Sequence, residues 1–134
     1  MYDRSAFTMI ELVFVIVVLG ILAGIAIPKF AATRDDAKIA KARTTVASVR
    51  SGIVTERQQR LFRGENNFTA TLDSGSPYFT NVMQYGVSSG KWSKPAANQY
   101  KFTLNAGRTA TFDYNASTGT FGCSSGNLCS TLTE

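Results

Sequence analysis

One acidic side chain, Glu11, stands at the start of a long apolar stretch in this 134-residue chain. The segment from Leu12 to Ile27 contains no charged residue. A charged side chain costs on the order of 2.5 to 3.5 kcal/mol at the centre of a membrane helix, and less near its end. Such charges usually have a partner and a function. Glu11 is therefore a candidate for a specific ion pair.

Other residues that could carry chemistry are scarce. The chain has no histidine, so it lacks both a Ser-His-Asp and a Cys-His arrangement, and it has no glycine-rich phosphate motif. The neighbouring acids Asp35 and Asp36 are interpreted as a solvated charge pair. The sequence therefore predicts no catalytic residue, no cofactor and no metal site, and a protein that is not an enzyme.

The apolar segment from Phe7 to Ile27 is long enough to cross a membrane. As an α-helix its 21 residues span roughly 31 Å, against about 30 Å for a hydrocarbon core. A secretory signal peptide has a shorter apolar region, of about 7 to 15 residues, after a positive leader. Here the leader is short, and its Arg4 is offset by Asp3.

The residues at the boundary between the leader and the apolar segment resemble those of a known family. The run Ala6-Phe7-Thr8-Met9-Ile10-Glu11-Leu12, followed by Gly20, Gly24 and Pro28, is similar to the N-terminus of type IV pilins and of the related pseudopilins of type II secretion. The resemblance is specific from Phe7 to about Phe30 and only architectural beyond. The chain departs from the family at Ala6, where glycine is usual. Alanine is the next smallest side chain and should fit a tight peptidase subsite.

The resemblance implies a processing reaction and an assembly contact. A prepilin peptidase would remove the leader, residues 1–6, by cutting between Ala6 and Phe7, and Phe7 would become N-methylated. Glu11 would then pair with the ammonium group of Phe7 on a neighbouring subunit, which gains several kcal/mol at an intermediate dielectric. Pairing within one helix is an alternative, because the two residues are four apart. A further alternative is that Glu11 only caps a signal-anchor helix.

The same resemblance implies partners and a location. The partners are other copies or related pilin subunits, an inner-membrane platform protein and an assembly ATPase. The precursor would cross the inner membrane once, with its C-terminal domain in the periplasm, before joining a pilus or a periplasmic pseudopilus. Nine basic residues follow the apolar segment between Lys29 and Arg63, whereas Arg4 alone precedes it. A literal positive-inside count would favour the opposite orientation, whereas the cysteines and the resemblance favour this one.

Beyond Pro28 the apolar positions become periodic, which predicts that the helix continues in amphipathic form. They recur at three- and four-residue steps. We expect the helix to run from Phe7 to Phe62 and to end at Gly64, because glycine suits the left-handed position after a helix. Residues 7–28 form its transmembrane and assembly half and residues 29–63 its amphipathic half. The apolar positions are Ile39, Ala42, Val46, Val49 and Ile53.

Gly20, Gly24 and Pro28 interrupt the apolar half at four-residue spacing. Proline removes a helical hydrogen bond, and glycine costs about 1 kcal/mol relative to alanine. One interpretation is close packing between membrane helices through small residues. The other, taken from the family, is local melting of the helix when the subunit leaves the membrane. The two are compatible.

The remaining residues predict a small antiparallel sheet. Residues 64–98 are rich in glycine, serine, asparagine and proline, and we expect a connecting loop region with one or two short elements. Residues 99–134 alternate apolar and polar side chains around two turns, which predicts a meander of three strands with one apolar face. A preceding strand containing Trp92 would be a fourth. We expect the apolar face to pack on Val46, Val49 and Ile53. Its members are Tyr100, Phe102, Leu104, Ala110, Phe112, Tyr114, Phe121 and Cys123.

Cys123 and Cys129 are the two cysteines of the chain. In an extracytoplasmic protein such a pair predicts a disulfide, which contributes about 2 kcal/mol for so short a loop and would hold the tail against the last strand. Free thiols are the alternative. Type IV pilins often carry a C-terminal disulfide loop, although a longer one.

The predicted fold is therefore α+β and pilin-like: a long N-terminal helix packed on an antiparallel sheet of three to four strands. The leading hypothesis for function is a structural subunit of a type IV pilus or pilus-like filament. One alternative is a pseudopilin of a type II secretion system, although no aspartate-rich calcium loop is visible. Another is a DNA-binding minor pilin, because the basic helix could attract phosphates. The last is a secreted or anchored protein with a signal sequence cut after Ala26.

Overall fold

The computed structural model describes residues 6–134, and these residues divide into a first unit that ends at Asp36 and a second unit, Ala37–Glu134. Most of the expected leader, residues 1–5, lies outside the described residues. One helix, α1 (Met9–Phe62), forms most of the described part of the first unit and a layer of the second. It begins two residues later than predicted, because Thr8 caps it and Phe7 precedes the cap.

In the first unit, α1 exposes apolar side chains all round. Large apolar residues from Met9 to Phe30 are exposed, including Phe14 at 68% and Leu19 at 58%. In the described part of the chain, α1 is the one helix that is long and apolar enough to cross a membrane by length and composition. Such a surface is stable only in lipid or against other protein.

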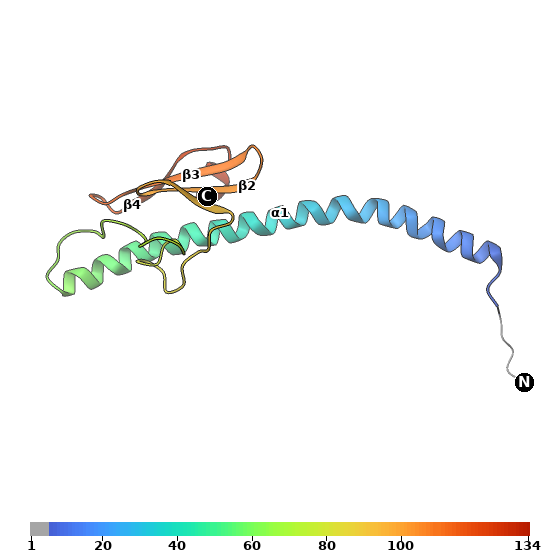
Figure 1. Ribbon diagram of the computed structural model, residues 1–134, viewed down its shortest axis with the longest axis horizontal. Helices are drawn as coiled ribbons and strands as arrows, with labels where there is room; N and C mark the ends of the chain where they lie inside the picture. The colour runs from blue at the N-terminus through green and yellow to red at the C-terminus, as the bar shows by residue number, and fades with distance from the viewer. Residues whose placement is uncertain (1–5) are drawn as a thin grey trace, which may run out of the picture. The chain divides into compact units, whose positions relative to one another are not determined.

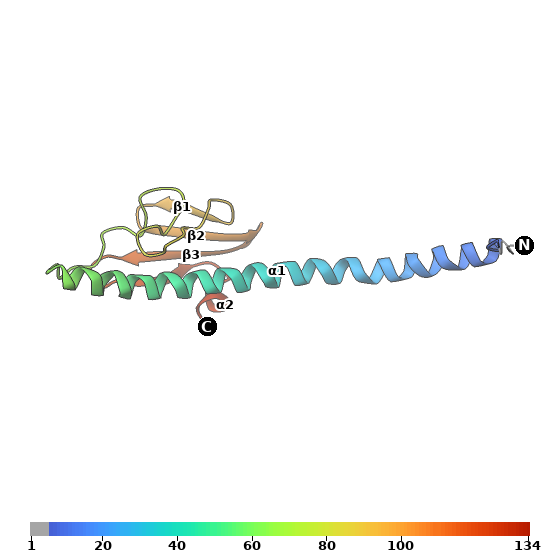
Figure 2. The ribbon, with the colours of Figure 1, turned by 90° about the horizontal axis from the view of Figure 1, so that it is seen from below.

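The second unit contains a four-stranded antiparallel sheet in the order β1-β2-β3-β4. Its strands are β1 (Trp92–Ala96), β2 (Gln99–Asn105), β3 (Arg108–Asn115) and β4 (Thr120–Ser125). Figure 2 shows β1, β2 and β3 succeeding one another across the sheet. The strand containing Trp92, left open in the sequence, is therefore present. A five-residue helix, α2 (Cys129–Thr133), follows β4 and was not predicted, because one turn leaves no readable periodicity.

The sheet packs one face on the amphipathic half of α1, as Figure 1 shows. All five apolar positions predicted for this half of the helix are buried, with at most 8% exposure. They share one core with the alternating residues of the strands, among them Tyr100, Phe102 and Phe112, so the predicted packing is confirmed. The rings of Phe112 and Phe121 stack with centroids 5.1 Å apart.

The helix ends as the sequence predicts. Gly64 adopts a left-handed φ of 84° and donates its N–H to the carbonyl of Leu61, and Glu65 donates its N–H to the carbonyl of Arg60. These two bonds form a Schellman motif, which satisfies carbonyl groups that the end of the helix leaves unpaired.

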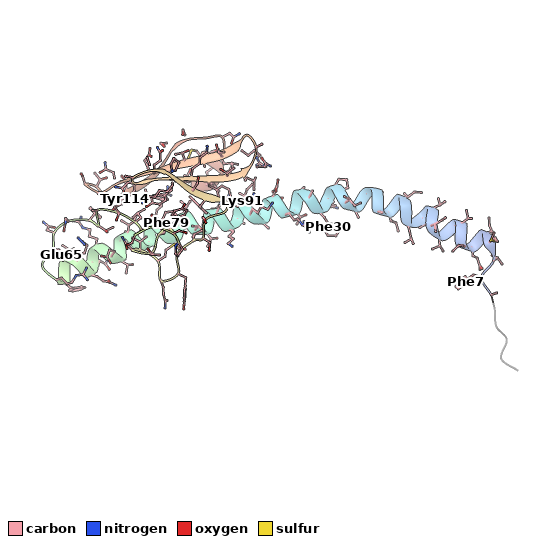
Figure 3. All side chains as sticks on the ribbon, viewed as in Figure 1. Phe7, Phe30, Glu65, Phe79, Lys91 and Tyr114 are labelled. Carbon is pink, nitrogen blue, oxygen red and sulfur yellow. A yellow bond between two sulfur atoms is a disulfide. The ribbon has the colours of Figure 1, made fainter. Side chains whose placement is uncertain are left out.

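The segment between α1 and β1 contributes to the core as well as connecting the two elements. Leu72 and Phe79 are fully buried, and Phe79 lies between α1 and the sheet in Figure 3. Tyr78 and Val87 exchange two backbone hydrogen bonds of 2.8 Å each. The predicted connecting region, residues 64–98, therefore contains side chains that are buried in the core, and it also contains β1.

A buried acid, Asp73, fixes this segment to the sheet. Its carboxylate accepts a hydrogen bond from the Tyr100 hydroxyl, one from the Lys94 ammonium at 2.8 Å and one from the Gly75 N–H at 3.1 Å. A buried charge is tolerated when it is paired and hydrogen-bonded in this way. Burial, reinforced by the bond to Asp73, raises the pKa of Tyr100 well above its usual value.

Candidate assembly and processing site

The backbone just before α1 contains the bond that the sequence predicts to be cleaved, between Ala6 and Phe7. Ala6, Phe7 and Thr8 are exposed and non-helical, and the Phe7 side chain is 87% exposed. Figure 3 shows Phe7 just before the start of α1. A peptidase must bind its substrate in an extended form, and the Ala6–Phe7 bond is not held in helical hydrogen bonds. The expected cleavage site is therefore accessible, and its use stays a prediction.

Glu11 and Thr8 form a capping box. A Glu11 carboxylate oxygen accepts hydrogen bonds from the Thr8 N–H at 2.9 Å and from the Thr8 hydroxyl at 3.0 Å. In return, the Thr8 hydroxyl oxygen accepts the Glu11 N–H at 3.3 Å. These bonds satisfy donors that the first turn of a helix leaves unpaired.

Glu11 therefore caps the helix, as one of the alternatives drawn from the sequence expects. The signal for it, Thr-x-x-Glu before an apolar run, was readable in the sequence but was missed. In the uncut chain residue 7 has a peptide N–H rather than an ammonium group. The ion pair between Glu11 and Phe7 therefore stays a prediction that concerns the processed chain.

Gly20, Gly24 and Pro28 all lie inside α1, which is continuous through them. A Cβ added at Gly20 or Gly24 would meet nothing within 4 Å, so both positions are open for a neighbouring helix. Pro28 has no N–H, so the carbonyl of Gly24 loses its partner four residues on. The two interpretations, close packing and local melting, both concern an assembled or membrane-bound state and stay predictions.

The arginines of the amphipathic half of α1 are used within the second unit. Arg43 donates to the Thr131 carbonyl at 2.7 Å, and Arg50 donates to the Phe121 carbonyl at 3.0 Å. Arg57 lies over the Phe68 ring, 4.0 Å from its centroid. Near the end of the helix, Arg60 and Arg63 form ion pairs with Glu65, and Arg63 also pairs with Glu56. These contacts give the basic helix a structural role that needs no phosphate.

The two cysteines form the predicted disulfide. Cys123 of β4 and Cys129 of α2 are joined, with their Cα atoms 5.6 Å apart. The bond ties α2 to the edge of the sheet, where Leu128 and Leu132 are buried. The described residues contain no group of three or more His, Cys, Asp or Glu side chains that could hold a metal ion.

Two comparisons relate this chain to known proteins. A family model described as a prokaryotic N-terminal methylation motif matches residues 1–27. Over 128 residues, which are 96% of this chain and 93% of the relative, the chain is 30% identical to the type IV narrow pilus major component PilA5 of Thermus thermophilus. No solved structure matches the chain. The likeness to this relative thus extends well past residue 30, where the sequence motifs had ended.

Proposed function

This chain belongs to the type IV pilin family, and from this premise we propose that it is a structural subunit of a type IV pilus, polymerised through its N-terminal helix. The observation that carries the proposal is the exposed apolar half of α1 with one carboxylate, Glu11, at its head. A filament core buries such a helix after it leaves the membrane, and the single carboxylate offers a specific partner for each incoming subunit.

The proposed precursor is cut between Ala6 and Phe7 by a prepilin peptidase, and Phe7 is then N-methylated. The exposed, non-helical backbone at this bond supports the proposal. After the cut, the Phe7 ammonium group lies one residue from the capping box. Glu11 then exchanges its bonds with Thr8 for an ion pair with Phe7 of a neighbouring subunit.

We place this subunit in a surface pilus rather than in a secretion pseudopilus. The support is the relative, whose name describes it as a pilus component. The proposed role is structural and needs no catalytic residue. Before assembly the subunit crosses the inner membrane once, with the second unit in the periplasm. An inner-membrane platform protein and an assembly ATPase extract it, and the filament consists of copies of this chain or related subunits.

The test is mass spectrometry of the N-terminal peptide from native membranes and from sheared filaments. The expected N-terminus is N-methyl-Phe7. A chain starting at Met1 in both samples would contradict the processing step, and a chain starting at Ile27 would indicate an ordinary signal sequence instead.

Glu11→Ala separates processing from assembly. Because the cleaved bond lies before α1, we expect this variant to be cut and methylated normally. It should yield few or no filaments, because the ion pair at the head of the helix is lost. Filaments in wild-type amounts would contradict the role of Glu11.

A further inference from the structure

One hollow on the surface of the second unit is lined by no charged residue. Four small residues on one side of α1 lie beside residues 82–85 of the following loop, and together they line a shallow hollow of about 490 Å³. We name it the uncharged patch: Ser48, Ser51, Gly52, Thr55, Val82, Met83, Gln84 and Tyr85. Glu56, at its edge, is paired with Arg63.

The uncharged patch faces away from the sheet. Ser51 and Thr55 are exposed, whereas Val46, Val49 and Ile53 on the opposite side of α1 are buried. In Figure 1 the segment between α1 and β1 projects past α1 on the side away from the sheet. Its Tyr85 is 80% exposed. Tyrosine and methionine are enriched, and charges depleted, at the cores of protein interfaces.

The loop is held against the helix by a close backbone contact. A Cβ at Gly52 would overlap the carbonyl group of Val82, so glycine is needed for the loop to approach this closely. The N–H groups of Val82 and Met83 bond to the carbonyl of Phe79, which is fully buried. The patch is therefore preorganised, which lowers the entropy lost when it binds.

We propose that the uncharged patch binds the apolar half of α1, residues 12–27, of a second copy of this chain. This inference rests on the proposed function and names the surface that receives the helix. Among the described residues, this half of α1 is the long apolar surface that still needs a partner outside the membrane. Its residues 12–27 are also uncharged. Contact between the two surfaces therefore buries no unpaired charge, which would otherwise cost several kcal/mol.

Electrostatics favours the same pairing. Each copy has a net charge of +5, so contacts between copies must avoid bringing basic surfaces together. The uncharged patch and the apolar half of α1 meet this condition. They are also different surfaces of one chain. A contact between unlike surfaces is heterologous, and it continues from copy to copy as an open filament when its rotation does not close a ring.

The direct test is photo-cross-linking in assembled filaments of the full chain. A benzophenone amino acid in place of Tyr85 should cross-link to a peptide within residues 12–27 of another copy. The same probe in place of Ser117, on the exposed turn after β3, should not reach that peptide. Cross-links from position 85 only to other segments, or none between copies, would overturn the inference.

A matched pair of charge insertions gives a second readout. Ser51→Lys places an ammonium group in the uncharged patch, and lysine is a better helix former than serine, so the fold is retained. We expect normal precursor levels but loss of filaments. Ser117→Lys adds the same charge on the exposed turn and should assemble like wild type. Wild-type filament yield from Ser51→Lys would overturn the inference alone, whereas wild-type chains that form no filaments would contradict the proposed function as well.

Discussion

At the head of α1, Thr8 and Glu11 satisfy each other through three hydrogen bonds. Before the cut, the carboxylate therefore has donors within its own chain, which offsets part of the cost of placing it next to lipid. The same carboxylate becomes available for a neighbour when Phe7 gains its ammonium group. Two residues at i and i+3 thus provide both a helix cap and, in the proposed filament, the assembly contact.

Tyr100 predicts how stability responds to alkali. Its hydroxyl is buried against Asp73, with Lys94 and Tyr114 among the neighbouring titratable groups, and its pKa is raised above the ordinary value of about 10. In the unfolded chain the tyrosine loses its proton first as the pH rises. The unfolded state then binds fewer protons than the folded state, so the free energy of unfolding falls as the pH rises above about 10.

Tyr100→Phe should make this fall shallower, measured by urea unfolding of the full chain in nonionic detergent between pH 9 and 11. The pKa of Tyr114 is also raised by burial, so part of the slope remains. At neutral pH the variant should lose about 1 to 3 kcal/mol, because Asp73 loses a donor. Tyr85→Phe is the control, since Tyr85 is exposed, and should leave the slope unchanged. Identical slopes for Tyr100→Phe and wild type would contradict the argument.

At the scale of elements, α1 is one helix with two environments. Its first half is apolar all round, and its second half buries one side under the sheet. The loop after it is held by Asp73 from one side and by the contact at Gly52 from the other. The disulfide fastens α2, whose five residues are too few to form a stable helix alone.

Gly52→Ala distinguishes helix propensity from packing. Propensity alone would stabilise an alanine in a helix interior by about 1 kcal/mol. The added methyl group overlaps the backbone carbonyl of Val82, which cannot rotate away, and overpacking typically costs about 1 to 3 kcal/mol. We therefore expect a lower free energy of unfolding in denaturant titrations. Ser51 lies directly before Gly52 and is exposed, so the free energy of unfolding of Ser51→Ala should stay within about 0.5 kcal/mol of wild type. A more stable Gly52→Ala variant would show that the loop does not approach this closely.

At the scale of the whole molecule, the two units differ in where their apolar side chains lie. The described part of the first unit has no buried core and offers an apolar surface to lipid or protein. The second unit contains the whole buried core, from Ile39 to Leu132. This division suits a subunit that is stored in a membrane and then transferred to a filament, because the folded unit need not change when its helix changes surroundings.

Residues 37–134 should accordingly fold without the first unit. We expect this fragment to be soluble and to unfold in one cooperative transition, because every residue of the core is retained. Circular dichroism with thermal unfolding and gel filtration would measure this. The fragment should not form filaments, since it lacks the apolar half of α1. Aggregation, or a melting curve without a transition, would contradict the independence of the second unit.

Much of the fold was readable because its signals are local and periodic. The apolar steps from Ile39 to Ile53 predicted the buried side of α1, Gly64 predicted its end, and strand alternation predicted β2, β3 and β4. The disulfide was also readable, because the chain contains only the two cysteines Cys123 and Cys129 and they lie close together in the sequence. The sequence also showed a pattern that resembles a known family, formed by Phe7, Glu11, Gly20, Gly24 and Pro28. The roles of these residues in assembly stay predictions, because they concern contacts with other subunits, which a single chain does not contain.

By itself, then, the sequence determined the membrane-length helix, its amphipathic continuation and the sheet that packs on it, since each depends on residues a few positions apart. Only the tertiary structure decided which distant residues meet. Asp73 lies 27 positions from Tyr100, and Gly52 meets Val82 across the loop. No periodicity joins these pairs, because their contacts depend on the path of the whole segment between α1 and β1. The uncharged patch arises in the same way, from a helix face and a loop that folding brings together.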